Sequence, residues 1–203
     1  MNLEFKINGK VLETERLILR AFTLEDLDDF YEYASVPEVG EMAGWKHHEN
    51  KDESLIILSS FIESDKTFAI VLKENKKVIG SLGIEKYSDE DKLYEFKDYK
   101  GRELGFVLNK DYWGKGIMKE AADRVSEYLF DEMDLDFILC GHFEKNGQSR
   151  RVQEKCGFKP YRKLMINTSM GTQEKGFLNL KINPKKNIKF KFSHPDTLIW
   201  EGN

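Results

Sequence analysis

The segment from Glu103 to Ala122 predicts a strand that passes through a glycine-rich turn directly into a helix. Between Glu103 and Leu108, apolar residues occupy alternate positions, as in a half-buried strand. After Gly114 and Gly116, apolar residues recur every four positions, which is typical of the buried face of a helix: Ile117, Ala121, Val125 and Leu129. A helix begins with unpaired N–H groups and a partial positive charge, so glycines just before it let an anion reach the backbone. The segment therefore predicts an anion-binding turn, with a turn that only joins strand to helix as the alternative interpretation.

Other patterned segments surround this one. Apolar runs predict strands over residues 16–22, 68–72, 78–84, 137–143, 161–166 and 177–182, and a short polar run makes 68–72 and 78–84 a hairpin. Three further helices are expected: one that Thr23 and Asp26 cap and Pro37 ends, one over 52–64, and one between Asn146 and Gly157. On the first two of these helices the residues expected to face inward are Leu24, Leu27, Phe30, Tyr31, Ala34, Leu55, Leu58, Phe61 and Ile62. The charged stretch 85–101 is expected to be a solvated loop. This order predicts a single mixed α/β domain over residues 1–203.

Composition narrows the class of protein. The 203 residues are 40% hydrophobic and 33% charged, with a net charge of −4, which suits a soluble domain with one sizeable core. No apolar run approaches the roughly 18 residues of a membrane span, and the first ten residues lack the apolar core of a signal peptide, so we expect no membrane partner and a cytoplasmic location. Basic residues are scattered except near residues 185–191, which argues against nucleic-acid binding. Cys140 and Cys156 are expected to be free thiols, and no metal-ligand spacing occurs near them.

Three segments carry a resemblance to a known family. They are Glu13-Thr-Glu-Arg-Leu-Ile-Leu-Arg20, Tyr112-Trp-Gly-Lys-Gly-Ile-Met-Lys-Glu-Ala121 and Asn146-Gly-Gln-Ser-Arg-Arg-Val-Gln-Glu-Lys-Cys-Gly-Phe158. In this order and spacing they resemble the first strand, the acyl-CoA pyrophosphate loop and the Asn-x-x-Ser helix of the GNAT (Gcn5-related) N-acetyltransferase superfamily. The likeness is to the branch that includes ribosomal-protein N-terminal acetyltransferases. It covers residues 13–163, and residues 164–203 are expected to add C-terminal strands.

The resemblance implies a fold and a cosubstrate. The fold would be a mostly antiparallel twisted sheet, splayed between two parallel strands and flanked by helices on both faces. The cosubstrate would be acetyl-CoA, without a metal, bound between the strand ending near Asn109 and the strand ending near Phe143. A bulged strand would face the pantetheine arm, which Asn146 would also bind, and the turn amides would hold the pyrophosphate. The implied cofactor-binding residues are Val107, Leu108, Trp113, Gly114, Lys115, Gly116, Ile117, Met118, Lys119 and Asn146.

One departure from the family pattern concerns Met118, which is bulkier than the residue usual at the end of the loop. If Met118 points inward beside Ile117, the turn amides stay open and binding survives. If it points at the phosphates, affinity falls. A Walker loop would need Ser or Thr after Gly-Lys, and a dinucleotide fingerprint a third glycine, and neither is present.

Acetyl transfer to an amine requires a base, a polarised thioester carbonyl and a stabilised leaving thiolate. The family is thought to act by direct attack in a ternary complex, and here the N–H of Val107 or Leu108 would polarise the carbonyl. Glu103 is the first candidate base, with His142 as competitor, and a solvated strand-end charge and a half-buried structural histidine are the respective alternatives. Ser149 matches the serine near the thiol and would serve the leaving thiolate, unless it only satisfies helix amides.

The acceptor is an amine, with a protein N-terminus as the leading candidate and a small amine or aminoglycoside-like drug as its rival. In this architecture the first two helices and their connecting loop cover the acceptor. That points to Trp45 and His47, with Met42 and His48 beside them, although Trp45 could simply pack and the histidines could be solvated. Glu38 and Glu41 could attract a cationic amine. The chain could also be a non-catalytic acyl-CoA-binding module, and we expect a monomer or homodimer.

Overall fold

The structure is a computed structural model of the chain and describes residues 1–87, 96–188 and 200–201. It divides into two compact units. The N-terminal unit comprises Phe5–Ile84 and Gly105–Val125, and the C-terminal unit comprises Met1–Glu4, Glu85–Leu104 and Ser126–Asn203. Strand β5 (Gly101–Leu108) and helix α3 (Ile117–Asp131) each supply residues to both units. The expectation that residues 1–203 form a single domain stays a prediction.

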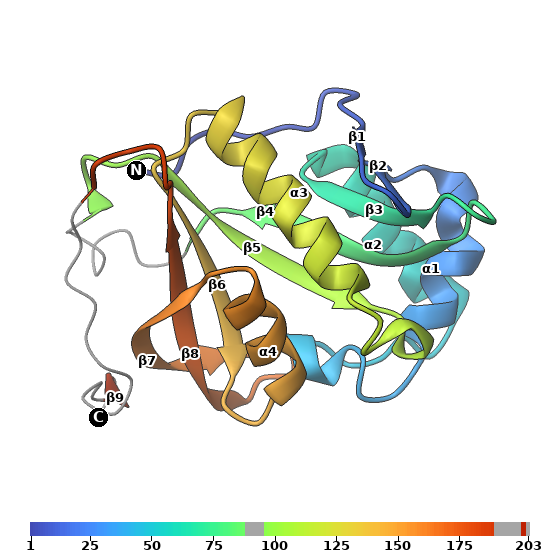
Figure 1. Cartoon of the computed structure of the whole chain (residues 1–203). Coiled ribbons are helices and arrows are strands. Elements are labelled where there is room, and N and C mark those ends of the chain that lie inside the picture. The colour runs from blue at the N-terminus through green and yellow to red at the C-terminus, as the bar shows by residue number, and fades with distance from the viewer. Residues whose placement is uncertain (88–95, 189–199, 202–203) are drawn as a thin grey trace. The chain divides into compact units, whose positions relative to one another are not determined.

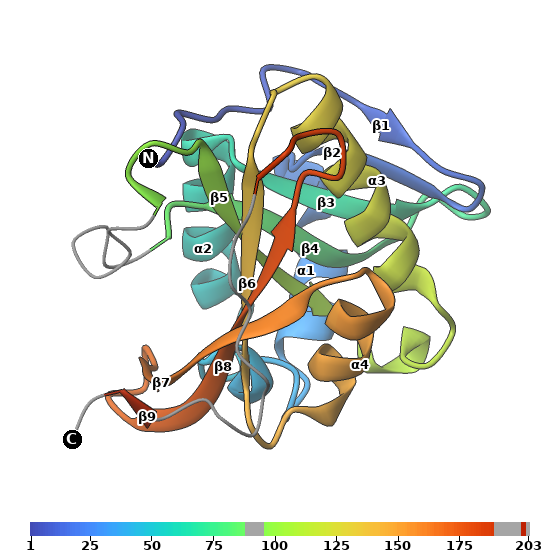
Figure 2. The same cartoon turned by 60° about the vertical axis from the view of Figure 1, so that its left-hand side comes forward.

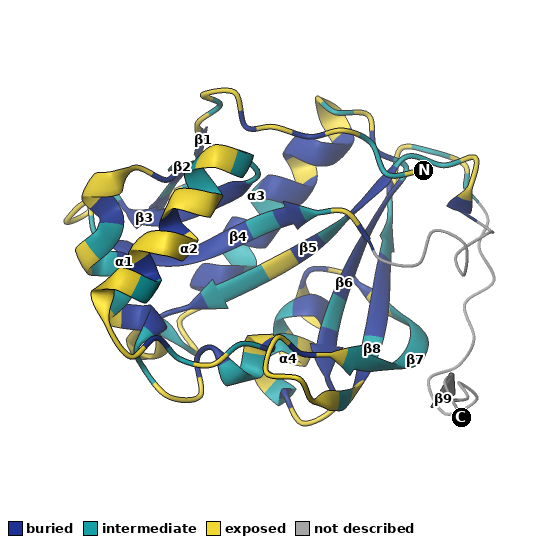
Figure 3. Ribbon diagram, turned by 180° about the vertical axis from the view of Figure 1, so that it is seen from behind, coloured by how far each residue is buried: buried dark blue, intermediate teal, exposed yellow. Residues whose placement is uncertain are grey.

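The N-terminal unit is built on an antiparallel meander. Its strands are β1 (Leu12–Glu13), β2 (Leu17–Ala21), β3 (Thr67–Leu72) and β4 (Val78–Glu85), with the end of β5 next in order. Strands β3 and β4 form the predicted hairpin, in which Phe68 lies opposite Leu82. Helices α1 (Leu27–Ala34) and α2 (Lys51–Ser64) cover one face of these strands, and the first part of α3 covers the other (Figures 1 and 3).

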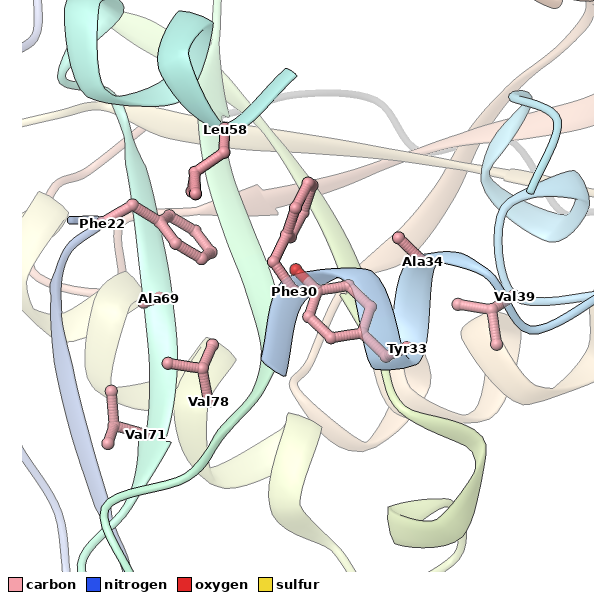
Figure 4. Packing of buried hydrophobic residues seen from close by; sticks show 9 residues of the cluster. All are labelled: Phe22, Phe30, Tyr33, Ala34, Val39, Leu58, Ala69, Val71 and Val78. Carbon is pink, nitrogen blue, oxygen red and sulfur yellow. The ribbon is translucent and has the colours of Figure 1, made fainter. Parts of the chain in front are cut away.

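The core of the N-terminal unit lies under α1 and α2 (Figure 4). Phe30 and Tyr33 from α1 and Leu58 from α2 meet side chains of the sheet, and the Phe22 and Phe30 rings approach edge to face at 5.8 Å. The buried members are Phe22, Phe30, Tyr33, Ala34, Val39, Leu58, Ala69, Val71 and Val78. Such burial is the main favourable contribution to folding.

Local signals set the ends of these helices. The Asp26 carboxylate accepts a hydrogen bond from the Thr23 N–H at 2.8 Å, as the capping pattern predicts, although residues Leu24–Asp26 form a 3-10 turn before α1. Asn50 caps α2 by accepting from the Glu53 N–H at 3.0 Å. Leu24, in the 3-10 turn, is exposed, which corrects one of the predicted inward positions.

Two further burial predictions also need correction. On α1 the fully buried tyrosine is Tyr33, while Tyr31 is only half-buried and its hydroxyl donates to the Glu49 main-chain oxygen. On α2 the inward position next to Leu58 belongs to Ser54, whose hydroxyl lies 2.7 Å from the buried His48 ring, so Leu55 is left 39% exposed. Because Ser54 contacts the buried His48, the buried face of α2 differs from the face that its apolar residues alone predict.

The C-terminal unit is built on the remaining strands of the chain. It contains the start of β5 followed in order by β6 (Phe137–Phe143), β8 (Gln173–Ile182), β7 (Lys159–Asn167) and β9 (Trp200–Glu201). Helix α4 (Gly147–Lys155) lies against these strands and contacts β6 (Figure 2). Asn146 caps α4, and Gly157 ends it in a left-handed conformation with Phe158 buried behind it, as predicted. Cys140 and Cys156 are buried free thiols.

The core of this unit draws on the stretch expected to be a loop. Phe96 stacks on Phe137 with ring centroids 4.2 Å apart, and Tyr87 packs on the same ring. Tyr87 and Phe96 are buried, so the ends of the 85–101 stretch belong to the core rather than to solvent. Residues 88–95, the middle of that stretch, lie outside the described residues.

The predicted mixed α/β fold is confirmed. Among the strand pairs whose register is described, all are antiparallel except β5–β6 and β7–β9. The parallel ladder of β5 with β6 covers Gly101 to Glu103 and ends at the pair Glu103–Leu139. Beyond that pair, β6 continues to bond β8 as far as Phe143. Glu103 therefore stands on β5 at the end of the parallel ladder.

Candidate functional site

The turn between β5 and α3 is anchored to the strand by two side chains. The Oδ1 atom of Asn109 accepts a hydrogen bond from the Asp111 N–H at 3.0 Å. The indole N–H of Trp113 donates to the main-chain oxygen of Leu108 at 2.8 Å, and its ring is partly buried against the core of the N-terminal unit. The indole N–H of Trp113 thus serves the turn itself.

The two glycines of the turn leave its backbone uncovered. Gly114 and Gly116 adopt left-handed conformations, with φ of 76° and 75°, and both are exposed. Among the described residues, a Cβ placed at Gly114 would meet no atom within 4 Å, and one at Gly116 would meet only Arg16 Nη2, at 3.8 Å. Helix α3 begins at Ile117, and its Glu120 N–H donates to the Gly116 oxygen, so the two glycines stand directly before the positive end of the helix. This is an arrangement that suits a phosphate group.

Met118 points into the protein and away from the turn. Both Met118 and Ile117 are only 4% exposed, in line with the buried stripe of α3. Of the two orientations considered for Met118, the structure has the one that leaves the amides open. The two lysines of the segment are engaged at their tips: the Lys115 ammonium lies over the Tyr112 ring, and the Lys119 ammonium pairs with Asp123 at 2.5 Å.

The sequence interpretation missed two side chains that hold the turn, Arg16 and Glu120. The Arg16 guanidinium donates to the main-chain oxygen of Lys115 at 3.0 Å and is itself held by Glu120 on α3, whose Oε2 accepts from Arg16 Nε at 2.7 Å. Glu120 Oε1 also accepts from the Thr14 hydroxyl and the Arg16 N–H. Partial burial would raise the pKa of Glu120, but these hydrogen bonds outweigh it and hold that pKa below its usual value. Arg16 lies about a hundred positions before Lys115, so no local pattern reveals this contact.

The strand before the turn lies close to β4. The Asn109 N–H donates to the Ile79 oxygen at 2.8 Å, and a Cβ at Gly80 would stand 2.4 Å from the Val107 oxygen, so only glycine permits this approach. Val107 packs against the core of the N-terminal unit and Leu108 is buried. The bulge at this strand end, and the role of both residues toward acetyl-CoA, stay predictions.

Glu103, the first candidate base, stands in the C-terminal unit where the β5–β6 ladder ends. A Cβ at Gly141 on β6 would lie 3.4 Å from its Oε1, so the carboxylate stands directly beside the Gly141 backbone. In the described part of the chain the carboxylate has no hydrogen-bond partner. Burial, with a smaller contribution from the negative charge of Glu85, raises the pKa of Glu103 to about 7. A carboxylate with that pKa exchanges protons readily at neutral pH.

His142, the competing base, lies on β6 in the same unit and is only 6% exposed. Its Nδ1 lies 2.9 Å from the main-chain oxygen of Phe143, and because that oxygen can only accept, Nδ1 carries a proton. The ring stacks on Phe177, and burial lowers the pKa of His142 below its usual value. His142 is therefore neutral near pH 7, with Nε2 as its remaining basic atom.

The start of α4 holds the other two predicted residues of this unit. Asn146 Oδ1 accepts from the Ser149 N–H at 3.0 Å, so Asn146 does act as a helix cap. The Ser149 hydroxyl makes no bond to a helix amide in the described residues; instead it accepts a hydrogen bond from Gln153 Nε2 at 3.1 Å. The predicted alternative for Ser149, a hydroxyl that satisfies helix N–H groups, is therefore not what the geometry has.

The two histidines of the loop before α2 contact neighbouring side chains and are not simply solvated. The Trp45 ring packs on Gly40 and on the His48 ring, 5.2 Å away, at the edge of the core. His48 is buried. His47 Nδ1 lies 2.7 Å from Glu41 Oε1, and hydrogen bonds from His47 and from main-chain N–H groups overcome partial burial to hold the pKa of Glu41 at about 2.

The acidic residues of this loop are already engaged, since Glu38 pairs with Lys110 at 2.7 Å and Glu41 with His47. The residues predicted as sites thus fall into two sets. Trp45, His47, Val107, Leu108 and the turn belong to the N-terminal unit, while Glu103, His142, Asn146 and Ser149 belong to the C-terminal unit.

Two absences apply to the described ranges only. None of their helices is long and apolar enough to cross a membrane. Nor do these residues contain a group of three or more His, Cys, Asp or Glu side chains that could hold a metal ion.

Comparison with known proteins assigns the family. The sequence profile described as "Acetyltransferase (GNAT) domain" matches residues 16–159. The uncharacterized N-acetyltransferase p20 of Bacillus licheniformis is 32% identical in an alignment of 155 residues, and the match covers 73% of this chain and 82% of that protein.

Solved structures share the fold. A GNAT-family acetyltransferase from Bacillus anthracis superposes with a TM-score of 0.74 at 23% identity, covering 86% of this chain and 99% of that one. The ribosomal-protein-S5-alanine acetyltransferase from Vibrio fischeri superposes with a TM-score of 0.63 at 20% identity, covering 86% and 97%. The chain belongs to the GNAT acetyltransferase family, whose members take the acetyl group from acetyl-CoA.

Proposed function

We propose that this protein transfers the acetyl group of acetyl-CoA to a primary amine by direct attack in a ternary complex, and that its main acceptor is a protein N-terminal amine. The observation that carries the proposal is the turn before α3. Its glycines leave the backbone open, it leads directly into the first turn of α3, and Met118 is turned away from it. The pyrophosphate of acetyl-CoA binds there, on the N–H groups of residues 114–119.

Glu103 serves as the base in this proposal. The ammonium form of the acceptor gives a proton to the carboxylate, directly or through a water, and the free amine attacks the thioester carbon. With a pKa of about 7, close to half of the Glu103 side chains are ionised at neutral pH, and the carboxylate has no other partner in the described residues to compete for the proton.

The remaining steps fall to a backbone amide and to Ser149. As the carbon–nitrogen bond forms, negative charge gathers on the thioester oxygen, and an N–H of Val107 or Leu108 stabilises it. The carbon–sulfur bond then breaks, the Ser149 hydroxyl donates a hydrogen bond to the leaving thiolate, and the proton lost by the nitrogen completes free CoA. Asn146 contributes to binding of the pantetheine arm.

The preference for an N-terminal amine rests on the resemblance of three sequence segments to the branch of ribosomal-protein acetyltransferases. It does not rest on charge in the acceptor loop, because Glu38 and Glu41 are already paired. Trp45 and His47 lie on this loop, and the ordered His47–Glu41 contact gives the acceptor a fixed surface to recognise.

The test combines acetyl-CoA, a thiol reporter and three acceptors: a peptide with a free N-terminus, the same peptide blocked at its N-terminus but carrying a lysine, and an aminoglycoside. We expect thiol release with the first peptide above all. Release with the aminoglycoside alone would assign a small-amine substrate. Tight binding of acetyl-CoA without thiol release on any acceptor would indicate a non-catalytic module, and failure to bind acetyl-CoA would refute the proposal as a whole.

A further inference from the structure

Behind Ser149 lies a buried chain of amide side chains in the C-terminal unit. Gln153, one turn further along α4, is 1% exposed, and Asn179 on β8 is 2% exposed. Gln153 Nε2 lies 3.1 Å from the Gly141 main-chain oxygen and 3.1 Å from Ser149 Oγ, and its Oε1 lies 2.8 Å from Asn179 Nδ2. A polar pair this deeply buried is costly unless its hydrogen bonds are made.

The direction of every bond in this chain follows from one fixed acceptor. The Gly141 carbonyl oxygen can only accept, so the side of the Gln153 amide that faces it must be nitrogen. The two hydrogens of that nitrogen are then used, one on Gly141 and the other on Ser149 Oγ. The Gln153 oxygen must face Asn179, which therefore presents its nitrogen.

The opposite end of Asn179 supports this assignment. Its Oδ1 is buried and has no hydrogen-bond partner in the described part of the chain. Turning the Asn179 amide around would place that oxygen against the Gln153 oxygen, two acceptors in contact, and would leave both without a donor. In the observed orientation only the Asn179 oxygen is unpaired, and the Gln153 amide keeps its hydrogen bonds.

The consequence reaches the Ser149 hydroxyl. Because Gln153 offers Ser149 only a donor, the hydroxyl proton of Ser149 cannot point at Gln153. No other bond to this hydroxyl is present in the described residues, so the proton is free to be given to a group outside the unit's own hydrogen-bond network. A serine whose oxygen lone pair is occupied and whose proton is free is preset as a donor.

We propose that Gln153, held by Asn179, is a positioning residue that fixes the Ser149 hydroxyl as a hydrogen-bond donor to the sulfur of CoA. This rests on the proposed function, which places that sulfur beside Ser149. Gln153 touches neither substrate nor cosubstrate; it acts through Ser149. A hydrogen bond to the thiolate favours the ionised form, so the network lowers the pKa of the bound CoA thiol and makes it a better leaving group.

The direct readout is the pKa of the CoA thiol bound to the protein, followed by the ultraviolet absorbance of the thiolate as pH is raised. Removing the hydroxyl in Ser149→Ala should raise that pKa by about one unit. Gln153→Met, similar in size but without the amide, should raise it by roughly half as much, because the hydroxyl survives but loses its orientation. The double variant Ser149→Ala/Gln153→Met should match Ser149→Ala alone, since Gln153 acts only through Ser149.

A matched control lies on the same helix. Gln148 is an exposed glutamine next to Ser149, so Gln148→Met makes the same chemical change without touching the network. Should Gln153→Met fail to fold, Gln153→Glu provides a second variant. Its buried carboxyl carries at most one proton, and the Gly141 oxygen would accept the hydrogen bond from it. Ser149 would then have no donor, and the pKa of the bound CoA thiol should again rise.

In the transfer assay, Gln153→Met should lower kcat about three- to tenfold with the dissociation constant of acetyl-CoA unchanged. The inference is overturned if CoA binds and its thiol has the same pKa in the wild type and in Gln153→Met, or if the Gln153 effect persists in full in the Ser149→Ala background. Failure of the wild type to bind CoA would be a different result, since it refutes the proposed function and this inference together.

Discussion

The Arg16 guanidinium donates a hydrogen bond to the main-chain oxygen of Lys115, 3.0 Å away, between the two glycines of the turn before α3. Glu120 holds the guanidinium from the first turn of the same helix. The β1–β2 turn, the glycine turn and the helix start are thereby joined through one side chain. A flexible pair of glycines thus becomes a turn with a defined shape before any ligand arrives.

Replacing Arg16 by glutamine should therefore weaken acetyl-CoA binding while leaving the fold intact. We expect the dissociation constant to rise about tenfold in titration calorimetry, because the ligand must order the turn itself. Arg124→Gln is the matched control, since Arg124 also donates to a main-chain oxygen, that of Glu13, but not in the turn. If wild type and Arg16→Gln bind acetyl-CoA with equal affinity, binding does not depend on the Arg16 contact with the turn.

Gly116→Glu should abolish acetyl-CoA binding. The new side chain would occupy the free space beside the turn and set a negative charge against the phosphates. Part of any effect could come from backbone strain, of order 1 kcal/mol for a side chain at positive φ. Gly171→Glu separates the two, because Gly171 has nearly the same φ, 74° against 75°, in an open turn elsewhere. If Gly116→Glu binds acetyl-CoA as well as Gly171→Glu does, the pyrophosphate assignment is wrong.

The pH dependence of kcat/KM should identify the base. Glu103 must be ionised to accept a proton, so its raised pKa predicts that activity climbs as pH rises through about 7 and then levels off. His142, whose pKa is lowered by burial, would give a limb below the ordinary histidine value of 6.5. Glu103→Gln should lose most activity and also lose the limb near pH 7. A limb below pH 6.5 that persists in Glu103→Gln and disappears in His142→Asn would transfer the role to His142.

The ion pair between Arg20 and Asp26 should matter for stability but not for chemistry. Asp26 is 6% exposed and accepts two hydrogen bonds from Arg20, at 2.7 and 2.8 Å, beside one from the Thr23 N–H. Asp26→Ala leaves the arginine without its partner and should lower the free energy of unfolding by about 3 kcal/mol in urea titrations. Asp28→Ala, which breaks the exposed pair with Lys51, should cause little change. Similar losses in both variants would contradict this ranking.

Much of the fold could be predicted because its signals are local. The four-residue repeat from Ile117 to Leu129 and the caps at Thr23, Asn146 and Gly157 each depend on near neighbours in sequence. Two of the predictions that were wrong concern positions that depend on a contact with a residue outside their own segment. Ser54 took the place expected for Leu55 because it meets His48, and Phe96 is buried because it stacks on Phe137.

The site divides in the same way. The open glycine turn could be predicted from its residue types, whereas the inward direction of Met118 could be decided only from the structure. Arg16 and Asn179 left no local signal, because their partners are far along the chain. Gln153 did leave one: a glutamine four residues after Ser149 and three before the buried Cys156 stands on the inward face of α4, where an apolar residue would be expected.

The central claim is acetyl transfer to an N-terminal amine, and the most direct measurement is the mass and fragmentation pattern of an acceptor peptide after incubation with acetyl-CoA and the protein. The peptide should carry both a free N-terminus and an internal lysine. The account predicts one acetyl group, on the N-terminal nitrogen, formed in step with the release of CoA thiol and greatly slowed in Glu103→Gln. An unmodified peptide in the presence of a protein that demonstrably binds acetyl-CoA would contradict it.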